Sequence, residues 1–179
     1  LRHELGWQWD PDELKKLVSS KTKMIVVCNP NNPTGAIMHD EIMDLVITIA
    51  EENDCWILSD EVYRGAELKG EECRSFAFST EKTIVNAGLS KAYSLPGLRI
   101  GWTVGSKTYI NRAWSFHDFT VINVSYLSDW IASKILECRR RKKILNRTKD
   151  HLNHHLNILY DWALDIPSIE ISKPEAAAI

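Results

Sequence analysis

The sequence lacks a long apolar run, an excess of charge of either sign, and internal repeats. No stretch of its 179 residues approaches the roughly 20 apolar residues that a membrane-spanning helix needs, and residues 1–4 show no targeting segment. Lysine and arginine number 22 against 24 aspartate and glutamate residues, so the net charge of −2 gives no general affinity for nucleic acid. We therefore expect a cytoplasmic globular protein with neither a membrane nor a nucleic acid as partner.

Spacings typical of disulfide frameworks and metal sites are also missing. The four cysteines form no CxxC pair, and two lie in strand-like runs, so reduced thiols are expected. These cysteines are Cys28, Cys55, Cys73 and Cys138. His151, His154 and His155 have helical spacing, but no carboxylate or cysteine completes a site, which favours a solvated helix face. No metal is predicted.

What the sequence does contain is an alternation of strand and helix patterns. Residues 24–29 and 55–60 are continuous apolar runs, typical of strands buried on both faces of a parallel sheet. Between them, residues 40–53 carry apolar side chains at helical spacing, and a short helix is expected at residues 11–19. Residues 83–87 add a further strand to this βαβ unit. The predicted fold class is therefore α/β.

The C-terminal part of the sequence is mainly helical. Residues 126–137 form an amphipathic pattern, and a longer one runs from the basic residues 139–143 to Pro167. We expect a break or bend near the basic run and exposed side chains along it, although contact with an acidic partner would need the same residues. Residues 169–171 are expected to begin a strand.

The change from mixed to helical pattern suggests two units. We interpret residues 1–138 as most of a large α/β domain, and residues 139–179 as an interdomain helix and the beginning of a small α+β domain. The sequence begins without methionine, and the second unit has no visible closing element. We therefore expect the chain to be a fragment of a longer protein.

A lysine and an arginine occupy the stretch at residues 88–102. Lys91 lies on a short loop between two apolar runs, where a dry environment would lower the pKa of its amine and make it a nucleophile. Arg99, beside a Pro-Gly turn, offers a planar fork for a phosphate or carboxylate. This pair suits a carbonyl cofactor that carries a phosphate, but a surface Lys and Arg in a Gly/Pro turn would look the same.

Polar residues also follow the other predicted strands. Asn32 comes after the first strand, Asp60 and Tyr63 after the second, and Lys91 after the third. Taken singly, these residues could be a turn former, a helix cap, a core tyrosine and a surface lysine. In a parallel sheet, however, the carboxyl ends of the strands share one edge, which is where ligands bind. Their joint position predicts a site.

Four motifs in this order resemble those of the fold-type I pyridoxal-phosphate aminotransferases, class I/II. The motifs are Asn29–Gly35 (NPNNPTG), Ser59–Tyr63 (SDEVY), Ser90-Lys91 and Pro96–Gly101 (PGLRIG). The resemblance implies the fold of that family, in which helices sandwich a mainly parallel sheet and a small α+β domain follows. It implies pyridoxal 5′-phosphate as cofactor, amino acids and 2-oxo acids as substrates, and a homodimer. It does not specify which amino acid is used.

The resemblance also implies roles for individual residues. Lys91 would bond covalently to the cofactor aldehyde and then move the proton of the substrate, and Asp60 would keep the pyridine nitrogen protonated. Tyr63 and Asn32 would hydrogen-bond the 3′ oxygen of the cofactor. The Asn32–Pro33 peptide bond is expected to be cis, as in the family.

Two further residues would bind the cofactor phosphate. Arg99 resembles the arginine that holds it, and Ser90 is a weaker candidate for the same role. The chain departs from the family at Gly88, where many members have serine or threonine. The upstream phosphate loop, the aromatic residue that stacks on the ring and the arginine for the substrate carboxylate find no match. The 179 residues alone are therefore expected to bind the cofactor weakly and not to transaminate.

Two alternatives remain open at this point. A C–S β-lyase of the same fold would use the same Lys91 and Asp60 but release a thiol and a keto acid. An aminotransferase-like effector domain of a transcription regulator would bind the cofactor without turnover. The complete Asn29–Gly35 motif and the lack of a winged-helix segment argue against the regulator.

Overall fold

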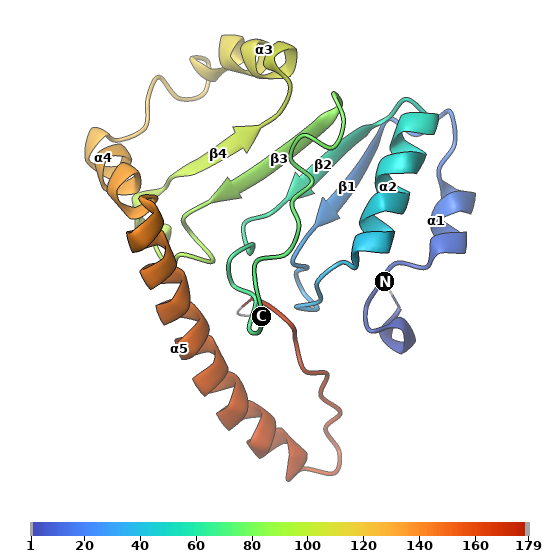
Figure 1. Ribbon diagram of the computed structural model, residues 1–179, viewed down its shortest axis with the longest axis vertical. Helices are drawn as coiled ribbons and strands as arrows, with labels where there is room; N and C mark the ends of the chain where they lie inside the picture. The colour runs from blue at the N-terminus through green and yellow to red at the C-terminus, as the bar shows by residue number, and fades with distance from the viewer. Residues whose placement is uncertain (1, 178–179) are drawn as a thin grey trace.

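Four strands form one twisted sheet in the order β1-β2-β3-β4 (Figure 1). The computed structural model describes residues 2–177. The strands are β1 (Met24–Cys28), β2 (Trp56–Asp60), β3 (Thr83–Gly88) and β4 (Gly101–Val104). Because β1, β2 and β3 are parallel and only β4 is antiparallel, the predicted mainly parallel sheet is confirmed. The carboxyl ends of β1, β2 and β3 therefore meet at one edge.

Two helices cover one face of this sheet. They are α1 (Pro11–Leu17), whose first turn is capped by the Asp10 carboxylate, and α2 (Asp40–Glu52). α2 packs on β1 and β2, and α1 lies beside α2 (Figure 1), and both helices contribute to the main apolar core. The fully or nearly fully buried members of this core include Val27, Met43, Val46, Ala50, Cys55, Ile57 and Phe76. The strand and helix periodicities of the sequence thus account for this half of the fold.

The prediction that the first strand is buried on both faces is wrong. Ile25 and Val27 of β1 are buried under α2, but Met24 and Val26, which point to the opposite face, are 40% and 60% exposed. β1 is the outermost strand of the described sheet, so it has a neighbouring strand, β2, on one side only. Side chains on its second face are therefore flanked by strand residues on that side alone. An apolar run indicates that both faces of a strand could be buried. Whether they are buried depends on which other helices or strands pack against each face.

A helix lies over the opposite face of the sheet, α3 (Lys107–His117). Its Tyr109 ring is 5.7 Å from the ring of Trp56, which points away from the α2 side of β2. Farther along, α3 and the ends of β3 and β4 line an open groove of about 680 Å³. Helices therefore lie on both faces of the sheet, but α3 has no buried residue and does not cover its face as α2 covers the other.

Two helices complete the chain beside the sheet, α4 (Tyr126–Ile135) and α5 (Cys138–Leu164). The predicted break near the basic run is present between them, at Leu136 and Glu137. They pack on the loops that follow β2 and β3 through a second apolar cluster. Its buried members are Ala66, Leu89, Ala92, Tyr93, Ala132, Ile135 and Leu145.

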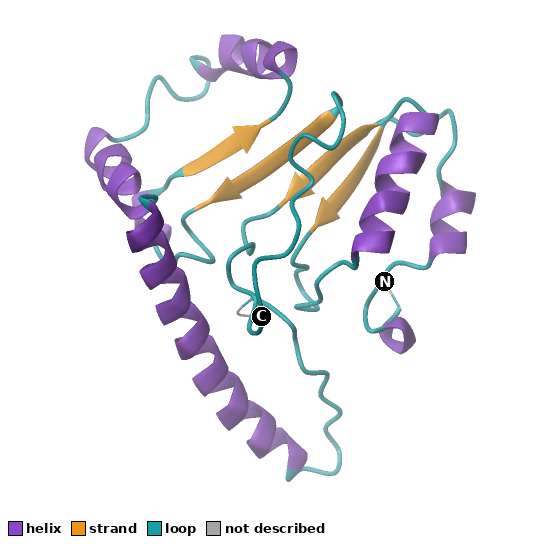
Figure 2. Cartoon of the chain, in the orientation of Figure 1, coloured by secondary structure: helices purple, strands orange, loops and turns teal. Residues whose placement is uncertain are grey.

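The prediction of a strand at residues 169–171 is wrong, because these residues form no ladder with another strand. After α5 the chain returns as a loop to the carboxyl edge of the sheet, as Figure 2 shows. There Ala176 forms a single bridge with Glu67. Two isoleucines two positions apart suit a strand, but a strand also needs a partner, and within the described residues this segment pairs with none.

Candidate active site

The loops after β1, β2 and β3 bring three of the predicted side chains together. The Nδ2 of Asn32 donates a 3.1 Å hydrogen bond to the Oη of Tyr63. The Nζ of Lys91 lies 5.7 Å from the centre of the Tyr63 ring. An amide, a phenol and an amine from three separate loops thus share one edge of the sheet.

Lys91 lines a cavity of about 410 Å³ between the strand loops and α5. Its walls are formed by Tyr63, Ala66, Ser90, Lys91, Ser94, Pro96, Thr148 and Leu152. The side chain of Lys91 is exposed, because the cavity opens to solvent on its side. The expectation that this lysine lies in a dry environment is therefore wrong for the described chain.

Asp60 ends β2 as a half-buried carboxylate. Its Oδ1 accepts a 3.1 Å hydrogen bond from the amide of Val62, which fixes the side chain at the start of the loop. Across the sheet its neighbours are Cys28 of β1 and Asn86 of β3. The pKa of the Cys28 thiol is raised, mainly by burial and further by the charge of Asp60. Asp60 thus lies on the face of the sheet opposite α2, beside the carboxyl ends of both neighbouring strands.

Arg99 lies apart from the other candidates. It takes the left-handed conformation, with φ 53°, directly after a short 3-10 turn. Its side chain is exposed, and Nη1 donates a 2.8 Å hydrogen bond to the carbonyl of Pro96. Within the described residues, no hydrogen bond joins Arg99 to Lys91 or Asp60, whereas Ser90 lines the same cavity as Lys91. The two phosphate candidates, Ser90 and Arg99, therefore lie on the same connection between β3 and β4 but do not form one cluster.

The Asn29–Gly35 motif folds on itself through its own side chains. The Oδ1 of Asn31 accepts a 2.8 Å hydrogen bond from the hydroxyl of Thr34, and the Oδ1 of Asn29 accepts one of 2.9 Å from the amide of Met38. The Asn32–Pro33 bond is cis, which confirms the prediction, and the Asn29–Pro30 bond is cis as well. This compact turn directs Asn32 toward Tyr63.

A segment that the sequence reading missed, residues 174–177, lies against this turn. The amides of Glu175 and Ala176 both donate to the carbonyl of Gly35, at 2.9 Å each. On the other side, the amide of Leu68 donates to the carbonyl of Glu175 at 2.8 Å. The segment therefore joins the loop that carries Asn32 to the loop that follows Tyr63. No short-range sequence pattern predicts contacts between residues that are this far apart in the chain.

One face of α5 was also missed as part of the site. Thr148 and Leu152 line the Lys91 cavity, and Leu145 packs on Gly65, where a Cβ would lie 3.0 Å from its Cδ2. The hydroxyls of Ser94 and Thr148 are 3.3 Å apart. The signal in the sequence is weak: Thr148 is a single polar residue within an apolar stripe of helical spacing.

The three neighbouring histidines of α5 are exposed. The rings of His151 and His155 are 4.2 Å apart, and that of His154 is 5.2 Å from His155. Within residues 2–177, no group of three or more His, Cys, Asp or Glu side chains is arranged to hold a metal ion. The described helices also include none that combines the length and apolarity needed to cross a membrane.

Comparisons with known proteins agree with this geometry. Residues 1–178 match the family model for aminotransferase class I and II. An aspartate aminotransferase of Pyrococcus horikoshii is 29% identical over 99% of this chain and 46% of its own length. An aspartate aminotransferase of Bacillus subtilis is 30% identical over 93% of this chain and 43% of its own.

The fold is also that of solved structures. The crystal structure of a PLP-dependent aminotransferase from Streptococcus suis is 34% identical, with a TM-score of 0.89 over 99% of this chain and 46% of that chain. An aspartate aminotransferase of Thermus thermophilus, solved with maleate, reaches a TM-score of 0.89 at 25% identity. The chain spans just under half the length of the relatives it matches.

Proposed function

Since this chain belongs to the class I and II aminotransferase family, we propose that the protein moves an amino group from an amino acid to a 2-oxo acid with pyridoxal 5′-phosphate as cofactor. The relatives that support the proposal are named as aminotransferases. The observation that carries it is the hydrogen bond between Asn32 and Tyr63 beside the amine of Lys91. The cofactor carries an aldehyde next to a phenolic oxygen, so it requires an amine that can bond to the aldehyde and hydrogen-bonding groups that can hold the oxygen.

The residues present fit this cofactor part by part. Lys91 offers an exposed amine at a cavity of a size usual for small ligands. The joined side chains of Asn32 and Tyr63 suit the 3′ oxygen, and the half-buried carboxylate of Asp60 suits a protonated ring nitrogen.

The phosphate end fits less completely. Ser90 lies in the Lys91 cavity, and Arg99 precedes β4 on the same connection. Gly88 cannot readily be a serine here, because a Cβ would lie 3.0 Å from the carbonyl of Ile100, the residue directly before β4. We infer that Arg99 and Ser90 bind the phosphate, and that the close approach of β3 and β4 accounts for the glycine.

The chemistry of the site follows from these positions. When bound, the cofactor supplies a ring that accepts the electron pair left when the substrate loses its α-proton. The amine of Lys91 would take the α-proton of the substrate as general base and then, as general acid, donate a proton to the C4′ carbon of the cofactor. Asp60 holds a proton at the ring nitrogen through its negative charge. Tyr63 and Asn32 donate hydrogen bonds that stabilise negative charge on the 3′ oxygen.

We also propose the domain division at residues 138 and 139 and a homodimer. α5 begins at Cys138 and leaves the sheet, which supports the boundary. The homodimer is supported by the family and by a run of exposed large apolar side chains that extends from α3 through the following loop into α4. They are Trp114, Phe116, Phe119, Val121, Ile122, Val124, Tyr126, Leu127 and Trp130. All four cysteines are free, in keeping with our expectation of a cytoplasmic location.

A transfer assay tests the proposed function. The full-length protein with pyridoxal 5′-phosphate should convert amino donors only when a 2-oxo acid is present, and Lys91→Ala should abolish the reaction. Lys82→Ala is the matched control, since Lys82 pairs with Asp54 at the surface away from the site. Thiol release without a 2-oxo acid would instead identify a C–S β-lyase.

A further inference from the structure

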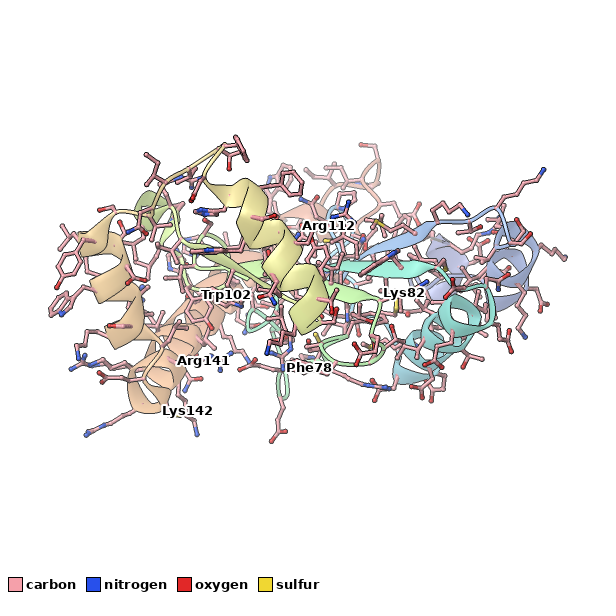
Figure 3. The ribbon with its side chains drawn as sticks, turned by 90° about the horizontal axis from the view of Figure 1, so that it is seen from above. Phe78, Lys82, Trp102, Arg112, Arg141 and Lys142 are labelled. Atoms are coloured by element: carbon pink, nitrogen blue, oxygen red, sulfur yellow. The ribbon has the colours of Figure 1, made fainter. Side chains whose placement is uncertain are left out.

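One residue of the basic run at 139–143 differs from the other four. Four of the five side chains are exposed, as the sequence predicted, but Arg141 is directed toward the sheet and its side chain is 30% exposed. Arg140, its neighbour, is 57% exposed, and among the described residues its ion pair is with Glu137, three positions earlier. Figure 3 labels Arg141 on the inner side of α5 and Lys142 at its outer edge.

The guanidinium of Arg141 binds two loops of the candidate site at once. Nη1 and Nη2 donate to the two carboxylate oxygens of Glu72, at 2.5 and 2.8 Å. Nε donates a 2.9 Å hydrogen bond to the Oη of Tyr93, whose ring is buried. All three hydrogen bonds come from one rigid planar guanidinium, so they fix the positions of Glu72 and Tyr93 relative to each other.

Both partners are attached to residues of the site. Tyr93 is on the loop of Lys91, and Glu72 also accepts an ion pair at 3.2 Å from Arg64, which directly follows Tyr63. The direct backbone link between the two loops is a single hydrogen bond of 3.3 Å, from the amide of Ala92 to the carbonyl of Val62. Arg141 thus adds a polar link between the two loops to the apolar packing of Ala66 on Leu89, Ala92 and Tyr93.

The ion pair stays charged over the pH range in which the site would work. Arg141 is the main cause that lowers the pKa of Glu72, and Glu72 in turn raises the pKa of Arg141. A neutral partner on either side would leave a half-buried charge without compensation.

We propose that Arg141 is a positioning residue for Lys91: by holding Glu72 and Tyr93 together, it sets the position of the lysine amine relative to Tyr63. This inference rests on the proposed function, because it concerns the amine that would bond to the cofactor. It predicts that Arg141 affects the reactivity of that amine without touching cofactor or substrate.

The test compares Arg141→Lys and Tyr93→Phe with Arg140→Lys in the full-length protein. Arg141→Lys keeps the positive charge but loses the planar guanidinium, and Tyr93→Phe removes only the hydroxyl group. Two quantities are measured: hydrogen exchange of residues 88–95 without cofactor, and the pH midpoint of the absorbance of bound pyridoxal 5′-phosphate. We expect both variants to exchange about tenfold faster and to shift the midpoint by about half a unit or more, the scale of one charge-assisted hydrogen bond. Arg140→Lys should change neither quantity.

The two variants should also be non-additive when combined, because both remove the hydrogen bond between Nε of Arg141 and Oη of Tyr93. Exchange rates and midpoints equal to those of Arg140→Lys, or lowered global stability alone, would overturn the inference. A wild-type protein that gives no absorbance band with the cofactor would instead refute the proposed function. The two failures are therefore distinguishable.

Discussion

Asp60 is the residue whose chemistry depends most on its place at the end of a strand. Its carboxylate is half-buried and accepts a hydrogen bond from the amide of Val62. A carboxylate fixed in this way can hold a proton on a ring nitrogen, whereas an amide of the same shape cannot.

Asp60→Asn should therefore leave cofactor attachment intact but slow removal of the substrate α-proton. A lost buried charge partner costs about 3 kcal/mol, which corresponds to roughly a hundredfold or more in rate. Single-turnover half-reactions, followed by absorbance, measure this rate. Asp44→Asn, on the surface of α2, is the control. Equal rates for Asp60→Asn and wild type would remove Asp60 from the mechanism.

At the scale of elements, the sequence predicted what is local. The strand at residues 24–29 and the helix at residues 40–53 follow from side-chain periodicity, and they appear as β1 and α2. The motif order at the strand ends predicted that Asn32, Tyr63 and Lys91 would share one edge. The prediction of a strand at residues 169–171 was wrong because strand pairing depends on the edge of another strand far away in the sequence, which side-chain periodicity does not reveal.

Contacts across long sequence separations account for the rest of what was missed. Arg141 binds Glu72, 69 residues away, and Gly35 contacts residues 174–176. A basic run suggests exposure, and a turn glycine suggests only a bend. Neither pattern contains the partner, so only the folded chain reveals these two links.

Gly35→Ala should test the link at the Asn29–Gly35 motif. Gly35 has φ +68°, and a Cβ there would lie 2.4 Å from the Cβ of Pro174 and 2.9 Å from the carbonyl of Ala176. Gly70 has the same φ, +68°, with no atom within 4 Å of its Cβ position. Each substitution should lower the free energy of unfolding by about 1–2 kcal/mol, because alanine is strained in the left-handed backbone conformation. Gly35→Ala should lower it further, because residues 174–177 must move.

Chemical denaturation of the two variants measures the difference. Cofactor affinity should fall for Gly35→Ala alone, since Asn32 shifts with its loop. If both variants lost equal stability and both kept full affinity, the contact with residues 174–177 would have no role in the site.

At the scale of the whole molecule, the chain spans just under half the length of its relatives and exposes an apolar surface. We expect residues 1–179 made alone to bind pyridoxal 5′-phosphate orders of magnitude more weakly than the full-length protein. The family resemblance implies a phosphate loop and a substrate arginine that find no match in these residues, so several charge-assisted hydrogen bonds, each worth about 1.5–3 kcal/mol, would be lost.

The same 179 residues should also self-associate through the exposed side chains between α3 and α4. Spectral titration and light scattering measure both effects, with the full-length protein as reference. Tight binding together with amino transfer by these residues alone would show that they form a complete site.

The assignment of Lys91 as the residue that bonds to the cofactor can be tested by mapping that bond. The full-length protein is loaded with pyridoxal 5′-phosphate, reduced with borohydride, digested and analysed by mass spectrometry. We expect a phosphopyridoxyl group on the peptide that contains Lys91 and its absence from that peptide in Lys91→Arg, with Lys82 unlabelled in both. A label on any other lysine, or none on Lys91 after saturation with the cofactor, would contradict it.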